Sequence, residues 1–195
     1  MLLENCTFRP FNQEILNTCK PFDCGHEDLN DFFLNDCIPY SNDLIGKSYC
    51  FTLDENPKTI VCAFTISNDS IKVADLPNAR KKKVNELIAR AKHFRSYPGV
   101  LIGRLGVSQE FRGQGIGPEL MNFIKAWFID GQNKTGCRFI VVDSYNESSP
   151  LSFYKKCGFK TLFSTEEQEM EYLNMPQDEK LSTRLMYFDL IVLKS

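Results

Sequence analysis

The stretch RLGVSQEFRGQGIG, residues 104–117, decides the fold. It begins as an apolar run typical of a buried strand, passes through a turn rich in glycine, and enters a segment with apolar residues at helical spacing. Glycines let the backbone approach a ligand and point successive N–H groups into one concavity, and a helix N-terminus adds about half a positive charge. The stretch therefore predicts a phosphate-binding turn between a strand and a helix.

Two better-known phosphate loops do not fit this chain. Gly113, Gly115 and Gly117 are spaced by two residues, and Pro118 stands where a dinucleotide-binding GxGxxG pattern would need its last glycine. Residues 41–48 read SNDLIGKS, which lacks the first glycine of a P-loop and is followed by a strand-like run. The turn is therefore neither a Rossmann fingerprint nor a nucleotide-triphosphate loop.

The segments around this stretch predict a mixed sheet. CRFIVVDSY, residues 137–145, is the nearly continuous apolar run of a strand buried on both faces, so residues 100–145 form a strand-helix-strand crossover with parallel strands. Further predicted elements are a helix over 26–37 ended by Pro39, an antiparallel meander of three runs over 48–73, a helix over 80–95, a short helix over 150–157 closed by Gly158, and closing strands.

Together these elements predict an α/β protein: a mixed, mostly antiparallel sheet with a central parallel crossover and flanking helices. The 195 residues, 43% of them hydrophobic, suit one domain over 1–195, with a core at about 48–163 and an acidic insertion at about 164–182. The insertion is open to interpretation as a lid, a dimer contact or a segment without function.

The composition and charge of the chain indicate which binding partners and which cellular location to expect. A formal charge of -2 gives no global basic field, so nucleic acid or an anionic membrane would need a local patch. Neither a signal peptide nor a membrane-length apolar run is present, which predicts a cytoplasmic protein with no membrane partner. Eight cysteines lie among apolar neighbours without CxxC or HxxxH spacing, which predicts buried free thiols and no metal site.

Arg112, Gly115 and Gly117 fill the coenzyme A loop pattern of the GNAT acetyltransferases: Arg or Gln, two residues, Gly, one residue, Gly or Ala. The preceding LGV and the later NESSPLSFYKKCGF, residues 146–159, also resemble segments of that superfamily in the same order. A tight structural turn is the alternative interpretation of RGQGIG alone, and the downstream segment makes it the weaker one. The resemblance covers residues 48–163 and implies the GNAT fold.

The resemblance also implies roles at the site, with acetyl-CoA as cosubstrate and no metal. The backbone of Leu105, Gly106 and Val107 would pair with the pantetheine arm, and the Val107 amide would stabilise the oxyanion. The amides that would hold the pyrophosphate belong to Arg112, Gly113, Gln114, Gly115, Ile116 and Gly117. Asn146 would hydrogen-bond the pantetheine, although it precedes Tyr154 by one residue more than is common in the superfamily.

Tyr154 matches the tyrosine that protonates the leaving thiolate, a step that a phenol with pKa of about 10 can perform. The alternative for Tyr154 is a core aromatic residue. No glutamate base stands on the strand before the loop, where Arg104 is the only charged residue. Asp143 and Glu110 are the remaining candidates. A missing base favours an α-amine, pKa about 8, over a lysine, pKa about 10.4.

A second resemblance concerns the acceptor. FDCGHEDLNDFF at 22–33, ADLPNARKKK at 74–83 and SYPGVLIGRLGV at 96–107 resemble acetyltransferase toxins that modify the α-amine of aminoacyl-tRNA. The cations that would touch tRNA phosphates are Arg80, Lys81, Lys82, Lys83, Arg90, Lys92 and Arg95; a solvated helix N-terminus is the alternative.

Three functions therefore stay open from the sequence. The first is acetyl transfer from acetyl-CoA to an unidentified primary amine, and the second is its tRNA-directed form. The third is a non-catalytic acyl-CoA-binding sensor, against which Tyr154 argues. A homodimer is compatible with all three.

Overall fold

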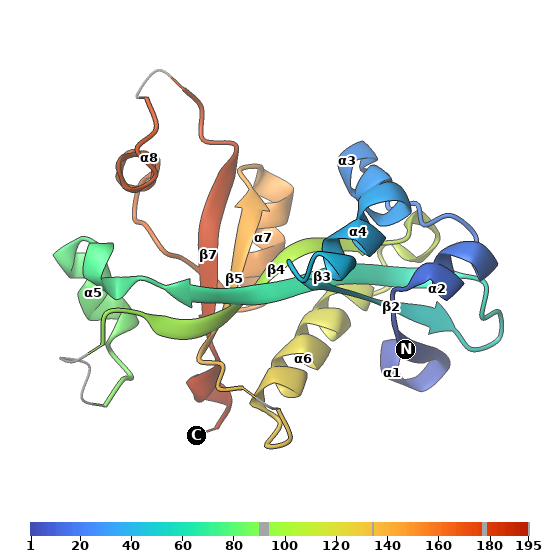
Figure 1. The fold of residues 1–195 in the computed structure, drawn as a ribbon. Coiled ribbons are helices and arrows are strands. Elements are labelled where there is room, and N and C mark those ends of the chain that lie inside the picture. Colours follow the sequence, from blue (N-terminus) through green and yellow to red (C-terminus); the bar gives the residue numbers. More distant parts are fainter. Residues whose placement is uncertain (90–93, 134, 177–178, 195) are drawn as a thin grey trace. The chain divides into compact units, whose positions relative to one another are not determined.

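A computed structural model describes residues 1–89, 94–133, 135–176 and 179–194 and contains a seven-stranded sheet (Figure 1). The strand order is β1-β2-β3-β4-β5-β7-β6. The strands are β1 (Cys6–Pro10), β2 (Lys47–Leu53), β3 (Ile60–Ile71), β4 (Tyr97–Val107), β5 (Phe139–Tyr145), β6 (Lys160–Thr161) and β7 (Thr183–Asp189). The pairs β1–β2, β2–β3, β5–β7 and β6–β7 are antiparallel, and β4 and β5 are neighbours. The predicted α/β class with a mixed sheet is confirmed.

The described part of the chain contains eight α-helices, of which α1 precedes the first strand and the others connect strands. They are α1 (Leu2–Asn5), α2 (Gln13–Thr18), α3 (Glu27–Asp31), α4 (Cys37–Asn42), α5 (Asn78–Val84), α6 (Ile116–Ile129), α7 (Ser148–Lys156) and α8 (Glu166–Tyr172). Helix α6 joins β4 to β5, as the predicted crossover requires. Leu120, Met121 and Ile124 on its apolar face are fully buried, as their helical spacing predicts.

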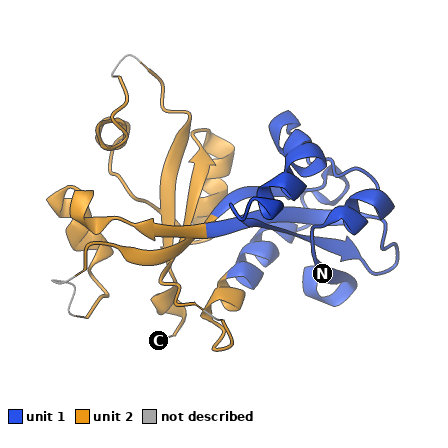
Figure 2. Ribbon diagram, in the orientation of Figure 1, with its two compact units in different colours: residues 1–67, 102–124 blue, residues 68–101, 125–195 orange. Residues whose placement is uncertain are grey.

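The chain divides into two compact units (Figure 2). Unit 1 comprises Met1–Ser67 and Ile102–Ile124, and unit 2 comprises Asn68–Leu101 and Lys125–Ser195. Strands β3 and β4 belong in part to each unit. Each unit has its own buried apolar cluster. The unit 1 cluster includes Phe11, Phe33, Cys37, Cys50 and Ala63, and the unit 2 cluster includes Ile71, Val84, Phe139, Leu162 and Phe163.

Three local predictions are wrong. The helix over 26–37 does not end at Pro39, because a π-helical turn, Phe32–Asp36, connects α3 to α4 and leaves Pro39 in the first turn of α4. A first-turn residue needs no N–H partner within its helix, so proline is tolerated there. The third run of the meander is no separate strand, because β3 continues to Ile71. Helix α5 ends at Val84 and residues 85–89 are not helical, while residues 90–93 of the predicted helix lie outside the described residues.

The cysteines, the lengths of the helices and the grouping of metal-ligating side chains bear on the predictions made from composition. All eight cysteines are free, and five of them are buried, as predicted; burial raises the pKa of Cys50 to about 12. Within the described ranges, no helix is both long and apolar enough to span a membrane. The same residues contain no group of three metal-ligating side chains.

Candidate functional site

The glycine-rich turn lies between β4 and α6 in unit 1. One turn of 3-10 helix, Gln109–Phe111, precedes it, and Arg112 to Gly115 are exposed. Gly113 and Gly115 have φ of 76° and 80°, in the left-handed region that other residues rarely adopt. A Cβ atom at either position would meet nothing within 4 Å. Glycine is therefore needed there for the backbone path and not for space.

The amides of this turn are available to a ligand. Among the described residues, the N–H groups of Gly113, Gln114 and Gly115 make no hydrogen bond, and the first backbone bond beyond them runs from the Glu119 N–H to the Gly115 carbonyl at 3.3 Å. They lie at the positive end of the 14-residue helix α6. Exposed donors at such a position suit an anion such as a pyrophosphate.

A second segment, residues 22–25, supports the turn. Gln109 is bonded twice to Asp23: its N–H donates to the Asp23 carbonyl at 3.0 Å, and its side-chain amide donates to Oδ2 at 2.7 Å. The Arg112 guanidinium donates to the Cys24 carbonyl. The Arg112 N–H, which is predicted to hold the pyrophosphate, donates to the Gln109 carbonyl at 3.3 Å, so both the backbone amide and the side chain of Arg112 hold the turn in place.

Asp23 is the centre of this support. Its Oδ1 accepts the Gly25 N–H at 2.8 Å and the Asn30 side-chain amide at 2.7 Å. The hydrogen bond from Gly25, then those from Asn30 and Gln109, hold the pKa of Asp23 below its ordinary value, with the Arg112 charge adding a smaller effect. The sequence analysis did not identify Asp23 or Gln109. The signal for Asp23 is the local pattern Asp-x-Gly, typical of a turn in which aspartate bonds the backbone two residues on.

Strand β4 brings the three predicted pantetheine-pairing residues to the edge of the turn. Its last residue, Val107, is followed by Ser108, whose N–H donates to the Val61 carbonyl on β3 at 2.9 Å. A Cβ atom on Gly106 would lie 3.0 Å from the Cys24 Sγ and 3.2 Å from the Phe22 ring. Glycine at 106 therefore permits β4 to lie directly against the supporting segment.

Tyr154 lies near the end of α7 in unit 2. The Gly158 N–H donates to the Lys155 carbonyl at 2.9 Å, and the Phe159 N–H donates to the Tyr154 carbonyl at 3.0 Å. With φ of 86° at Gly158, these two bonds form a Schellman motif. The Tyr154 and Phe159 rings, 5.5 Å apart, supply its apolar contact. The sequence YKKCGF, residues 154–159, thus sets the position of Tyr154 through the turn that ends the helix.

The environment of Tyr154 keeps its hydroxyl protonated. Its ring is partly exposed and lies 5.0 Å from the Phe153 ring. Removal of the hydroxyl from bulk water raises the pKa of Tyr154 well above its ordinary value, and the neighbouring Cys157 thiol adds to the effect. A phenol in this state can donate a proton at neutral pH and cannot accept one.

Lys125, on the part of α6 that belongs to unit 2, caps the end of α7. Its Nζ donates to the Cys157 carbonyl at 2.5 Å and lies 4.0 Å from the centre of the Phe188 ring. Its side chain is buried, and this burial lowers its pKa. A cation at the last carbonyls of a helix stabilises its end, so Lys125 positions the turn that holds Tyr154.

Asn146 has a structural partner in unit 2. Its side-chain amide donates to the Leu181 carbonyl at 3.0 Å, and its N–H donates to the Ser182 carbonyl at 2.8 Å. These bonds tie the end of β5 to the start of β7. A pantetheine contact of Asn146 stays a prediction.

The two base candidates are both exposed and belong to different units. Glu110 is exposed, next to the turn, in unit 1. Asp143, on β5 in unit 2, is exposed too, and desolvation by the groups packed around it, with a smaller effect from the Asp69 charge, raises its pKa. A raised carboxylate pKa suits a general base, so Asp143 is the better of the two candidates.

The predicted cationic patch is smaller than the sequence indicates. Arg80 is buried and donates to the carbonyls of Thr161, at 2.5 Å, and Leu162, and to the Ser164 hydroxyl at 3.1 Å. The prediction that Arg80 meets tRNA phosphates is therefore wrong. Lys82 and Lys83 are exposed and lie in the last turn of the short helix α5. Their positive charges interact favourably with the helix dipole there. Arg90 and Lys92 lie outside the described residues.

The acidic insertion is anchored to unit 2. Glu169, on α8, is 2% exposed; its carboxylate accepts Arg184 Nε at 2.7 Å and the Leu185 N–H at 2.5 Å. Tyr172 packs on Phe163 with ring centres 4.9 Å apart. A buried, paired glutamate and an aromatic contact indicate a structural element, so α8 is not a free lid.

Comparison with known proteins gives a match to one protein family over part of the chain. Residues 67–161 match the acetyltransferase (GNAT) domain family. The match covers 95 of the 195 residues and agrees with the predicted resemblance to the GNAT superfamily and with the predicted acetyl-CoA-dependent acetyltransferase. The predicted coenzyme residues, Leu105 to Gly117, lie in unit 1, and Asn146 and Tyr154 lie in unit 2.

Several solved structures have a fold similar to that of this chain. AtaT complexed with acetyl-methionyl-tRNAfMet is 19% identical, with a TM-score of 0.67 over 97% of this chain and 98% of AtaT. A tyrosine-to-phenylalanine mutant of KacT is 17% identical, with a TM-score of 0.68 over 98% of each chain. AtaTR bound with acetyl-CoA is 18% identical, with a TM-score of 0.63 over 98% of this chain and 99% of its own. Comparison with curated protein sequences gave no match.

Proposed function

We propose that this chain transfers the acetyl group of acetyl-CoA to a primary amine, with the coenzyme pyrophosphate held by the turn before α6. The observation that carries the proposal is the exposed turn itself, where left-handed glycines direct unpaired N–H groups outward at a helix N-terminus. Exposed N–H groups at a helix N-terminus are free to bind an anion in place of water.

The remaining roles follow from the chemistry. The backbone of Leu105 to Val107 pairs with pantetheine, and the Val107 amide stabilises the oxyanion that forms when the neutral amine attacks the thioester carbon. The new C–N bond forms as the C–S bond breaks, and the amine loses one proton. Tyr154 gives its hydroxyl proton to the departing thiolate, and Asp143 is the proposed acceptor of the amine proton.

We infer further that the acceptor is the α-amine of an aminoacyl-tRNA. Two observations support this: the likeness in fold to AtaT complexed with acetyl-methionyl-tRNAfMet, and the segments at 22–33, 74–83 and 96–107 that resemble tRNA-directed acetyltransferases. The lower pKa of an α-amine also suits a site without a glutamate on the strand before the loop. Lys82, Lys83 and Arg95 are the exposed cations that remain to meet phosphate.

The test is transfer of labelled acetyl from acetyl-CoA to a pool of charged tRNA, beside uncharged tRNA and the Tyr154→Phe variant. The proposal predicts label on charged tRNA only and its loss in the variant. Transfer to small amines but not to charged tRNA would contradict the tRNA-directed form and leave the N-acetyltransferase. Coenzyme binding without transfer to any amine would support the acyl-CoA sensor instead.

A further inference from the structure

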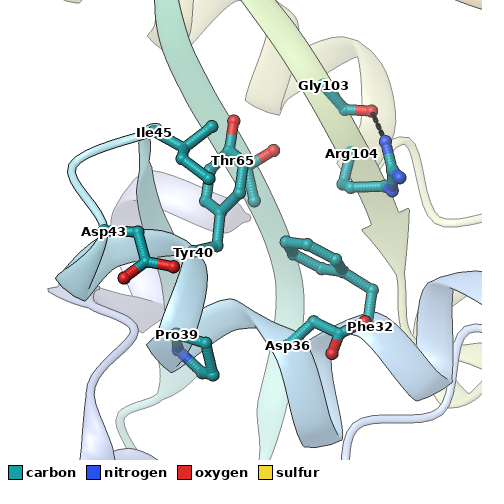
Figure 3. A pocket seen from close by; sticks show the side chains of 9 residues that line it. All are labelled: Phe32, Asp36, Pro39, Tyr40, Asp43, Ile45, Thr65, Gly103 and Arg104. Atoms are coloured by element: carbon teal, nitrogen blue, oxygen red, sulfur yellow. Dashed lines mark hydrogen bonds between the residues drawn. The ribbon is translucent and has the colours of Figure 1, made fainter.

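Arg104 is the one charged residue of strand β4, and the proposed function gives it no role. It is exposed, belongs to unit 1, and lines a cavity of about 370 Å³ together with Phe32, Tyr40, Thr65 and Gly103 (Figure 3). Helix α4 and the π-helical turn before it form one side of this cavity, and strands β3 and β4 form the other. Arg104 thus places a cation on the same strand as the proposed pantetheine-pairing residues.

The charge of Arg104 is not neutralised by an acid. Among the described residues it has no ion pair. Asp36 and Asp43 also line the cavity, but both are exposed to water, and Figure 3 shows them away from the guanidinium. The guanidinium makes one hydrogen bond in the described part of the chain, to the Gly103 carbonyl at 2.9 Å. Its other N–H groups are therefore able to donate to an anion.

An aromatic cluster orients the Arg104 side chain. The guanidinium carbon lies 5.1 Å from the centre of the Phe32 ring. That ring is 9% exposed and makes edge contacts with Phe33 at 5.4 Å and with Tyr40 at 5.6 Å. A guanidinium held over a fixed ring loses less freedom on binding than a lysine ammonium would, and its planar fork matches phosphate. Arg104 is therefore an oriented cation without a carboxylate partner.

The position of Arg104 sets the length of a ligand that could reach it from the reaction. Arg104 precedes Val107, the proposed oxyanion donor, by three residues, which span about 10 Å of strand. In an aminoacyl-nucleotide, about eight covalent bonds join the α-amine to the phosphorus of the 5′-phosphate, and they extend to about 10 Å. A hydrogen bond adds about 3 Å. An α-amine beside the Val107 amide thus leaves this phosphate within reach of the guanidinium.

We propose that Arg104 binds the phosphate of the terminal nucleotide of the acceptor, the nucleotide that carries the reactive aminoacyl group. The proposal rests on the proposed tRNA-directed function and deepens it, because it names the residue that selects a nucleotide acceptor over an uncharged amine. The nucleotide is favoured because its ester-linked ribose sets a separation of amine and phosphate that agrees with the spacing along β4. A peptide with an acidic side chain is the competing acceptor.

The first experiment measures binding and needs no turnover. Isothermal titration of the full chain, with coenzyme A present, compares 3′-aminoacylamino-3′-deoxyadenosine with its 5′-phosphate. Both analogues are prepared with methionyl, phenylalanyl and lysyl groups. We expect the phosphate to tighten binding by about tenfold or more in at least one pair, as for a charge-assisted hydrogen bond. Equal affinity within every pair, or no binding of any analogue, would overturn the proposal.

Variants show whether Arg104 is responsible for the gain. Arg104→Gln should remove it, and Arg104→Lys should keep only part of it, since lysine retains the charge without the fork. Lys58→Gln, at an exposed lysine of the same unit that does not line the cavity, should keep all of it. The analogue without phosphate should bind Arg104→Gln as it binds the wild type, which separates a phosphate contact from structural damage. A gain that persists in Arg104→Gln would contradict the proposal.

A peptide pair tests the competing acceptor. Two amidated tripeptides are titrated in the same way, one with aspartate and the other with asparagine as its third residue. The proposal predicts equal affinity for the two peptides. If the aspartate peptide alone gained affinity through Arg104, and the nucleotide phosphate gained none, the acceptor would be a peptide and the proposal would be wrong.

The two proposals fail in different ways. If charged tRNA is acetylated but Arg104→Gln leaves the gain from phosphate unchanged, the proposed function stands and the role of Arg104 is wrong. If the gain depends on Arg104 but no charged tRNA is acetylated, the phosphate contact stands and the proposed transfer is wrong.

Discussion

The turn before α6 and the end of α7 serve the same proposed reaction by different means. The turn offers backbone donors, and its glycines at 113 and 115 have open space around the position of a Cβ atom. The end of α7 offers one side chain, Tyr154, and the glycine that ends the helix is closely packed: a Cβ atom on Gly158 would lie 3.0 Å from the Phe188 ring. In the proposed reaction, coenzyme binding would therefore depend on the backbone path of the turn, whereas proton transfer would depend on the packing around a single hydroxyl.

This difference predicts that the two functions can be separated by mutation. Changes at the turn should alter coenzyme affinity, and changes at α7 should alter the rate of transfer or the stability of unit 2. The following variants test the separation in order of decreasing effect.

Gly115→Glu should abolish acetyl-CoA binding. It places a side chain at φ of 80° and a negative charge where the pyrophosphate is proposed to lie. Isothermal titration with acetyl-CoA measures the loss. Gly131→Glu is the matched control, since a Cβ atom there also meets nothing within 4 Å and its φ is ordinary. Retained affinity in Gly115→Glu would refute the assignment of the turn.

Tyr154→Phe should lower kcat by about 100-fold, the lower range for loss of a general acid, with the Kd for acetyl-CoA nearly unchanged. Steady-state kinetics with the best acceptor and direct titration measure the two quantities. Tyr172→Phe, which removes a hydroxyl from the insertion, should leave kcat unchanged. Unchanged turnover in Tyr154→Phe would remove this residue as the acid.

Lys125→Met should destabilise unit 2 by about 1–3 kcal/mol, because it leaves the Cys157 carbonyl without its donor and removes the cation from the Phe188 ring while keeping the aliphatic bulk. Chemical denaturation followed by far-UV circular dichroism gives the free energy of unfolding. Lys72→Met, at an exposed lysine of the same unit, is the control. An unfolding midpoint equal to wild type would show that the Lys125 contacts contribute nothing.

Asp23→Ala should weaken acetyl-CoA binding several-fold without changing kcat, since the exposed carboxylate acts on the coenzyme only through Gln109 and the turn. Glu55→Ala, an exposed acid of the same unit, should have no effect. If Asp23→Ala lowered kcat and left affinity unchanged, the supporting role proposed for residues 22–25 would be wrong.

The smallest expected effect is that of high pH on the acid. Because burial raises the pKa of Tyr154 above its ordinary value of 10.0, the phenol keeps its proton as pH rises toward 10. A plot of log kcat against pH should therefore show no fall between pH 8 and pH 10 from loss of this proton, within the range where the chain remains folded. A fall with apparent pKa below 9 that Tyr154→Phe removes would contradict this account.

The sequence predicted the central part of the fold, and the roles of the site residues stay predictions. The glycine-rich turn, the apolar run of β5 and the helical spacing in α6 are local signals, and the structure contains each of these elements. The sequence could also have revealed α8: Thr165 and Gln168 match the start of a capping box, and the Thr165 hydroxyl accepts the Gln168 N–H at 3.4 Å.

The rest depended on tertiary contacts. Arg80 stands in a run of lysines, and nothing local indicates that it alone turns inward to bond the carbonyls at Thr161 and Leu162. The support of the turn by Asp23 joins residues 86 positions apart, and the cavity beside Thr65 arises where a π-helical turn, β3 and β4 meet. Such contacts leave no periodicity in the sequence.

The central claim is that the turn binds the coenzyme and Tyr154 performs the chemistry. The most direct test measures both the Kd for acetyl-CoA and the single-turnover rate of acetyl transfer for the wild type, Gly115→Glu and Tyr154→Phe. The account predicts that Gly115→Glu loses binding and that Tyr154→Phe binds normally but transfers slowly. If Gly115→Glu bound acetyl-CoA normally, or if Tyr154→Phe transferred at the wild-type rate, the account would be contradicted.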